Sequence, residues 1–223
     1  MGHTYCECML KDNTLSIEKL ESDIWGLSYI PKMIDYDNDA DQLFGDFVIN
    51  HNNIPCHFSN CNIKTLEYII DSTNPTGILE IGVHRPTGTL DSSTKIILDK
   101  KSDSTTYIGI DKDPKDILDN SGNNVYSLSQ DSNNHQLVYD FMETIGVTGF
   151  DLIMIDGWHS VNMCVSDWKY TERLLENGVV ILHDTNFHPG PMLLFDAIDG
   201  ALFDKKLYCI NDNDYGLGVL RRK

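Results

Sequence analysis

Side chains that can bind ligands or move protons follow five apolar stretches of the sequence, each at the carboxyl end of its stretch. The first stretch is followed by an acid and a glycine, the next two by acids and an amide, and the last two by acids and histidines. In chain order they are Glu80 and Gly82; Asp111 and Lys112; Ser129, Gln130 and Asp131; Asp156 and His159; His183 and Asp184. Carboxylates and imidazoles of this kind accept protons near neutral pH, hold cations or bind hydroxyl groups.

The loop after the first stretch predicts a place where a ligand approaches the backbone. Gly82 has no side chain to block that approach, and Gly88 further along the loop has none either. Asp111 follows the second stretch, where dinucleotide-binding folds use an acid to accept hydrogen bonds from a ribose. No Gly-x-Gly-x-x-Gly occurs in the sequence, so a nicotinamide cofactor is the second choice.

Hydrophobic periodicity predicts the elements that position these residues. Strands are expected at 77–83, 106–111, 124–128, 150–156 and 179–182, with a terminal pair at 206–210 and 217–220. Helices are expected between them, from about 61 to 73, 91 to 99, 131 to 145, 160 to 177 and 191 to 202. The alternation predicts a Rossmann-like α/β fold with a doubly wound, mostly parallel seven-stranded sheet and an antiparallel C-terminal strand. Ligands bind such sheets at the carboxyl ends of the strands.

Two regions are expected. Residues 61–223 carry the regular pattern, whereas residues 1–60 have short apolar pieces interrupted by acids and prolines. We therefore expect residues 1–60 to form an irregular N-terminal cap or arm on a single α/β domain of residues 61–223.

Charge and composition exclude some partners. The chain has 34 acidic and 17 basic residues and a net charge of −17, which disfavours nucleic acids and anionic membrane surfaces. The sequence has no membrane-spanning stretch and no secretory signal at Met1–Leu10, so a cytoplasmic protein is expected. The six cysteines lack the usual spacing of zinc sites, and reduced thiols are predicted.

Over residues 61–223 the sequence resembles the class I S-adenosylmethionine-dependent methyltransferases. Leu79–Val83 resembles their first motif, Ile108–Pro114 the second, and Phe150–Asp156 and Leu175–Asp184 the later ones. The segment Ser129-Gln130-Asp131 is similar to the metal-dependent O-methyltransferases of the catechol and sugar-modifying types. The resemblance implies that S-adenosylmethionine is bound by Glu80, Gly82, Val83, Gly88, Asp111, Lys112, Ser129, Gln130, Asp131 and Asp156.

The same resemblance implies a metal and a catalytic base. Asp156, His183 and Asp184 stand where these families hold Mg²⁺ or another divalent metal. His159 stands where a general base lies three residues beyond the acidic residue that ends the fourth strand, Asp156, and both are candidate catalytic residues. His183 replaces the usual acid and Thr185 the usual amide. Since Mg²⁺ prefers oxygen ligands, the sequence leaves two readings: no metal, or a transition ion such as manganese or iron.

Other readings of these residues stay open at this stage. Glu80 and Asp111 are also compatible with solvated loop acids, Asp184 with a helix N-cap and His159 with a structural histidine. For function, the alternatives are an NAD-dependent oxidoreductase, a catalytically inactive cofactor-binding module and a metal-dependent hydrolase. The expected acceptor is a small-molecule or sugar hydroxyl, and a homo-oligomer is compatible with the sequence.

Overall fold

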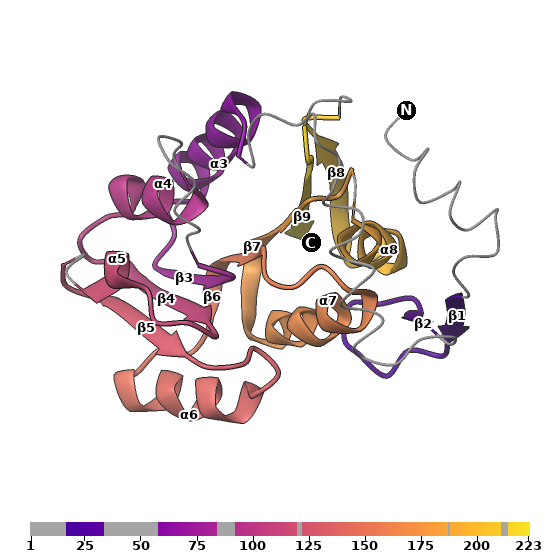
Figure 1. Ribbon diagram of the computed structural model, residues 1–223, viewed down its shortest axis with the longest axis horizontal. Coiled ribbons are helices and arrows are strands. Elements are labelled where there is room, and N and C mark those ends of the chain that lie inside the picture. Colours follow the sequence, from indigo (N-terminus) through magenta and orange to yellow (C-terminus); the bar gives the residue numbers. More distant parts are fainter. Residues whose placement is uncertain (1–16, 34–57, 84–91, 120–121, 187, 211–213) are drawn as a thin grey trace.

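The structure, a computed structural model, describes residues 17–33, 58–83, 92–119, 122–186, 188–210 and 214–223. A seven-stranded sheet in the order β5-β4-β3-β6-β7-β9-β8 forms its centre (Figure 1). The strands are β3 (Gly77–Ile81), β4 (Thr106–Asp111), β5 (Val125–Ser129), β6 (Phe150–Ile155), β7 (Leu174–His183), β8 (Phe203–Tyr208) and β9 (Leu217–Arg222). The five neighbouring strands β5, β4, β3, β6 and β7 pair in parallel, and β9 is antiparallel to both β7 and β8. The predicted fold class is confirmed.

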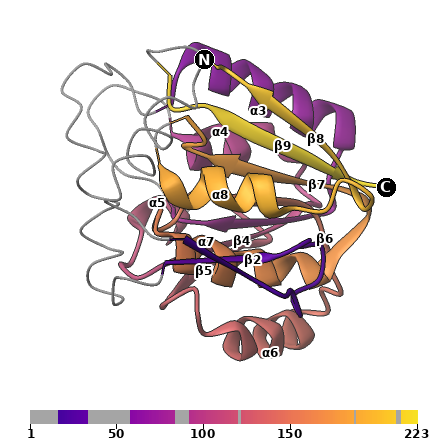
Figure 2. The same ribbon diagram turned by 90° about the vertical axis from the view of Figure 1, so that its right-hand side faces the viewer.

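Helices cover both faces of this sheet (Figure 2). They are α3 (Asn60–Thr73), α4 (Ser93–Lys100), α5 (Asp116–Asp119), α6 (His135–Ile145), α7 (Val161–Trp168), the 3-10 helix η1 (Lys169–Arg173) and α8 (Pro189–Ala197). Successive strand residues point to opposite faces, so Ile78 packs with α3 and α4 while Leu79 packs with α6, α7 and α8. Burial on both faces explains why the parallel strands read as continuous apolar runs. None of the helices in the described part of the chain has the length and apolar character needed to cross a bilayer.

Part of the N-terminal region, expected to be irregular, is a hairpin. The strands β1 (Ile17–Leu20) and β2 (Ile30–Met33) pair antiparallel, and Leu27 forms a bridge with Ile198 after α8. The indole Nε1 of Trp168 donates to the carbonyl oxygen of Trp25 at 2.9 Å. Each strand has only four residues, so the hairpin depends on packing against the main domain and leaves little periodicity in the sequence. The boundary at residue 60 stays a prediction.

The helix predicted from 160 to 177 is shorter in the structure. It begins after the N-cap Ser160 as expected, but α7 ends at Trp168, and β7 already begins at Leu174. The register between β6 and β7 shifts between Phe150 and Leu152, so residues 175–178 bulge out of the ladder. Asn177 lies in the left-handed region with φ +62. Pairing with β6 overrides the helical spacing of Leu175, which is 36% exposed.

The prediction of reduced thiols is wrong for two of the cysteines. Cys61, at the start of α3, forms a disulfide with Cys209, directly after β8, across a sequence separation of 148 residues. Cys164 is free and buried. The sequence gives no sign of this pair because its members are distant along the chain.

Candidate active site at the carboxyl ends of the sheet

Gly82 places the loop after β3 directly against the loop after β6. Its φ is +84, and a Cβ atom here would lie 2.0 Å from the carbonyl oxygen of Asp156. Both the backbone conformation and the close approach require glycine. The backbones of the first predicted motif and of the predicted metal site are therefore in contact.

Asp111 ties the loop after β3 to the end of β4. Its carboxylate accepts hydrogen bonds from the amides of Val83 and Asp113, both at 3.0 Å, and pairs with Lys115 Nζ at 3.2 Å. The side chain is 19% exposed. This predicted ribose-binding acid therefore lies beside the predicted cofactor loop with part of its surface accessible.

Glu80 has a different environment from the one the sequence suggested. It is fully buried, and its carboxylate accepts a hydrogen bond from Ser93 Oγ at 2.6 Å and another from the Tyr107 hydroxyl. Burial raises the pKa of Glu80 to about 7, although both hydrogen bonds act to lower it. The contacts favour a role in joining β3, β4 and α4; cofactor contact by Glu80 stays a prediction.

This buried acid predicts a pH-dependent stability. The pKa of Glu80 rises from 4.5 to about 7 on folding, so the folded protein keeps a proton that the unfolded chain has released. The free energy of unfolding should therefore fall as pH rises from about 5 to 8, by about 2–3 kcal/mol from this group. Glu80→Gln should flatten that fall in denaturant titrations, whereas Glu143→Gln, at an exposed acid of α6, should not. Equal slopes for the wild type and E80Q would contradict the assignment.

The residues after β5 also lie beside Asp111. The amide of Gln130 donates to the carbonyl of Asp111 at 2.8 Å, and Lys112 Nζ lies 3.1 Å from Asp131 on the surface. Ser129 is exposed. Both polar atoms of the Gln130 side chain are buried with no hydrogen-bond partner among the described residues. Unsatisfied buried groups are costly, so this amide is suited to a ligand. Gly88 lies outside the described residues.

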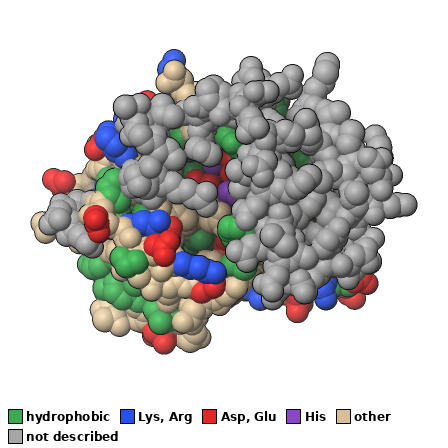
Figure 3. Space-filling view, in the orientation of Figure 1, with side chains coloured by type: hydrophobic (Ala, Val, Ile, Leu, Met, Phe, Trp, Pro, Cys, Tyr) green, Lys and Arg blue, Asp and Glu red, His purple; other side chains and the backbone are tan. Residues whose placement is uncertain are grey.

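An acid–histidine cluster forms where β6 and β7 end. His183 Nδ1 lies 2.9 Å from Asp156 Oδ1 and 3.0 Å from Asp184 Oδ1, and His159 Nε2 lies 2.6 Å from Asp184 Oδ2. A further histidine, His188, has its Nε2 3.8 Å from the same Oδ2. The structure thus brings together Asp156, His159, His183 and Asp184, as the sequence predicted. In the space-filling view, histidine and acidic side chains are visible together in a hollow of the surface (Figure 3).

Charge inside the cluster is balanced between the carboxylates and the imidazoles. Burial acts to lower the pKa of His183, but the neighbouring Asp156 and Asp184 raise it to about 9. Burial acts in the opposite direction on Asp184, yet His183 and His159 hold its pKa well below its usual range. Asp184 also has a φ of +64, which an aspartate tolerates better than most residues.

Two buried residues near the site were missed by sequence reasoning. His188 is the N-cap residue of α8 and is only 1% exposed; its spacing of four residues from Asp184 was the available signal. Asp167 is fully buried in α7, where desolvation raises its pKa to about 7. The N-cap role considered for Asp184 is not observed, because α8 begins after His188.

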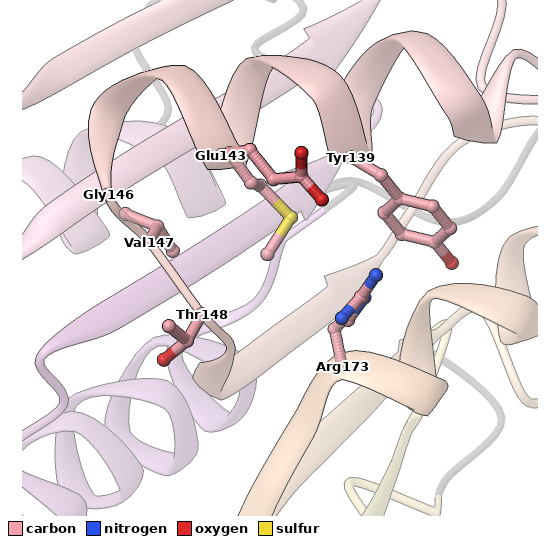
Figure 4. Close-up of a pocket in the computed structure, with 7 residues that line it drawn as sticks. Tyr139, Glu143, Gly146, Val147, Thr148 and Arg173 are labelled. Carbon is pink, nitrogen blue, oxygen red and sulfur yellow. The ribbon is translucent and has the colours of Figure 1, made fainter.

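A separate pocket lies at the opposite end of the strands. It has a volume of about 330 Å³ and is lined mainly by the end of α6, by the segment leading into β6 and by Arg173. Figure 4 shows the Arg173 guanidinium beside the Tyr139 ring, and its Cζ lies 4.9 Å from the ring centroid. Since β6 and β7 begin on this side, the pocket is distant along the strands from the cluster and is not the predicted cofactor site.

Several solved structures with a similar fold are O-methyltransferases. The O-methyltransferase from Bacillus cereus in complex with SAH has a TM-score of 0.52 and 15% identity, over 85% of this chain and 93% of that chain. A Staphylococcus aureus protein described as a caffeoyl-CoA O-methyltransferase has a TM-score of 0.56 and 14% identity, over 83% and 93%. MycE from the mycinamycin biosynthetic pathway, solved with Mg, SAH and mycinamycin VI, has a TM-score of 0.54 and 12% identity.

These likenesses define the class of fold. The chain has the α/β fold of the class I S-adenosylmethionine-dependent O-methyltransferases, and the resemblance found in its sequence motifs is confirmed at that level. The structural similarity to MycE covers 82% of this chain but only 54% of the MycE chain. No protein-family model matches the sequence, and no curated protein matches it.

Proposed function

We propose that this chain is an S-adenosylmethionine-dependent methyltransferase that methylates a hydroxyl group of a small molecule or a sugar. The observation that carries the proposal is the close approach of Gly82 to the backbone of Asp156. The approach is so close that the Cβ of any larger residue at position 82 would lie 2.0 Å from the carbonyl oxygen of Asp156. It brings the strand ends that carry Asp111 and Gln130, the expected cofactor residues, next to a cluster of groups that accept protons. The fold shared with SAH-bound O-methyltransferases supports the same assignment.

The cofactor site, in this proposal, is built from the first three strand ends. Asp111 accepts hydrogen bonds from the ribose hydroxyls, the unpaired amide of Gln130 binds the adenine side, and Gly82 allows the methionine part to approach the backbone. The methyl sulfonium is itself the electrophile, so the cofactor supplies the reactive bond. The protein contributes alignment of the acceptor oxygen with the methyl group, which lowers the barrier by restricting motion.

The acid–histidine cluster takes the proton that the acceptor hydroxyl loses. His159 is the general base expected from the sequence, and its Nε2 lies 4.0 Å from Asp156 Oδ1, the other candidate base. The donors of the cluster also fit a divalent ion, with carboxylate oxygens from Asp156 and Asp184 and imidazole nitrogens beside them. When bound, such an ion lowers the pKa of the acceptor hydroxyl and fixes its position.

Binding of the cofactor product separates this function from a nicotinamide-dependent one. In titration calorimetry, S-adenosylhomocysteine should bind the full chain and NAD should not. Asp111→Asn should weaken that binding by about 10- to 100-fold, because it replaces a carboxylate acceptor by an amide that also donates. Asp113→Asn is the matched control, since Asp113 is exposed and contributes only its backbone amide to Asp111.

Three outcomes would count against the proposal. They are tighter binding of NAD than of S-adenosylhomocysteine, an equal loss of binding in D111N and D113N, and no methyl transfer to any member of a broad panel of phenols, sugars and aliphatic alcohols.

Location and assembly belong to the same proposal. A cytoplasmic location, a homo-oligomer and the absence of nucleic-acid and membrane partners stay predictions. The disulfide between Cys61 and Cys209 argues against a strongly reducing compartment, where such bonds are rare. Mass spectrometry of the purified protein after alkylation would report the state of this pair in its native source.

A further inference from the structure

His188 points at Asp184 from a position that the proposed function does not use. Two sets of possible metal ligands share Asp184, one with Asp156 and His183 and the other with His159 and His188. Within each set, all donor atoms lie within 4.8 Å of one another. The sequence motifs led only to the first set, so the structure raises the question of which set holds an ion.

The position of His183 favours a hydrogen-bonding role. Its Nδ1 contacts a carboxylate oxygen of Asp156 at 2.9 Å and one of Asp184 at 3.0 Å. A ring nitrogen that lies between two carboxylate oxygens is placed as an N–H donor, because three lone pairs directed at one another would repel. Its other nitrogen, Nε2, lies 3.3 Å from the side-chain Nδ2 of Asn62, which is also buried. To coordinate an ion, His183 would have to give up its contacts with both carboxylates or its contact with Asn62, whereas His159 Nε2 would exchange one close contact, that with Asp184.

His159 and His188 are arranged differently. Their rings lie 4.5 Å apart at an angle of 36°, and both direct Nε2 toward Asp184 Oδ2, at 2.6 and 3.8 Å. Adjacent ligand atoms around a small divalent ion are themselves about 3 Å apart. An ion would thus fit among these three donors after side-chain shifts smaller than the length of a bond.

The backbone holds these two histidines together. The amide of Gly190, in the first turn of α8, donates to the carbonyl of His159 at 3.2 Å, and the amide of His188 donates to the carbonyl of Asp184 at 3.1 Å. A Cβ at position 190 would lie 2.2 Å from the carbonyl oxygen of His159, so glycine is required for this approach. The three donors therefore lie on segments whose spacing is fixed before any ion binds.

We propose that His159 Nε2, His188 Nε2 and a carboxylate oxygen of Asp184 bind one divalent transition-metal ion, with His183 outside its coordination shell. Two imidazoles and one carboxylate are a donor set of manganese, iron and zinc, whereas Mg²⁺ prefers oxygen alone. His183 is then a positioning residue that holds Asp156 and Asp184. The use of the ion in methyl transfer rests on the proposed function; its binding does not. With His159 Nε2 on the ion, the proton of the acceptor hydroxyl goes to Asp156 in place of His159, since Asp156 is the most open member of the cluster at 21% exposure.

Binding of Mn²⁺ to the full chain tests this assignment without any reaction. Titration calorimetry should give an affinity for Mn²⁺ at least about 100-fold higher than for Mg²⁺. Pulsed electron paramagnetic resonance of bound Mn²⁺ should show nitrogen coupling from two imidazoles. His159→Asn and His188→Asn should each weaken Mn²⁺ binding about 10- to 100-fold and each remove one of the two couplings.

Two further variants and two assays of folding make the result specific. His183→Asn should keep both nitrogen couplings, and so should His135→Asn, the matched control, whose ring contacts the carbonyl of Ser166 on the other side of α7. Thermal unfolding and S-adenosylhomocysteine binding confirm that each variant is folded.

The proposal is overturned by loss of nitrogen coupling in H183N, by retention of both couplings in H159N or H188N, by equal affinities for Mn²⁺ and Mg²⁺ without nitrogen coupling, or by no binding of either ion. Each of these results is compatible with intact cofactor binding and methyl transfer, which report separately on the proposed function.

Discussion

Replacement of Asp184 by asparagine should lower the rate of methyl transfer by about 100-fold or more while S-adenosylhomocysteine binding changes little. Asp184 is the one residue of the cluster that contacts His159, His183 and His188, at 2.6, 3.0 and 3.8 Å. Without its negative charge the three imidazoles lose their shared partner, and a bound ion loses a ligand. Asparagine tolerates the left-handed backbone conformation at φ +64, so the loop itself should keep its shape.

The measurement is the rate of S-adenosylhomocysteine formation with a confirmed acceptor, alongside calorimetric cofactor binding. Asp196→Asn, at an exposed position of α8, is the matched control and should leave both quantities unchanged. Removal of a buried charge also costs stability, so circular dichroism must show that D184N is folded at the assay temperature. A folded D184N enzyme with the wild-type rate would exclude the cluster from the reaction.

Reduction of the Cys61–Cys209 disulfide should lower the free energy of unfolding by about 3–5 kcal/mol. The bond joins residues 148 positions apart, and long closed loops restrict the unfolded chain most. Its effect reaches the site as well, because Asn186 Nδ2 donates to the carbonyl oxygen of Cys209 at 3.0 Å. Asn186 is two residues after Asp184, so the disulfide supports the loop that carries the cluster.

Denaturant unfolding with and without a reductant measures this contribution. The double variant Cys61→Ser, Cys209→Ser should unfold at the lower denaturant concentration under both conditions, which controls for other effects of the reductant. An unchanged midpoint for the wild type in reductant would show that the bond adds no stability.

The sequence predicted the sheet well because its parallel strands are buried on both faces. Leu79, Ile108 and Ile153 lie in neighbouring strands of one face, and such strands must be apolar throughout. The predicted cluster followed from topology alone, since the carboxyl ends of parallel strands meet at one edge of a sheet. Asp156 and Asp184 therefore had to be near each other once β6 and β7 were recognised as neighbours.

The errors concern contacts between distant parts of the chain. Leu175 continues the helical spacing of α7, but the pairing of Leu174 with Phe150 draws that segment into β7. The helix α6 begins after Asn134, which makes no side-chain capping bond, so the expected start near residue 131 was too early. Local pattern gives no information on such tertiary contacts.

His188 shows the same limit at the site itself. In the sequence it precedes two prolines and resembles a residue of a loop before a helix. Only the turn after β7, with Asp184 in a left-handed conformation, directs His188 back toward the carboxylate. The residue types of the cluster could therefore be predicted from the sequence. The inclusion of His188 could not, because it depends on the conformation of the turn after β7.

The tight approach of Gly82 to Asp156 has a thermodynamic consequence. The two loops share no intervening side chain, so any displacement of the loop after β3, the proposed cofactor loop, moves the segment that carries Asp156. Binding of a ligand at the loop after β3 and the geometry of the acid–histidine cluster are then linked. By reciprocity, whatever factor the sulfonium compound applies to the affinity of an ion, that ion must apply to the affinity of the sulfonium compound.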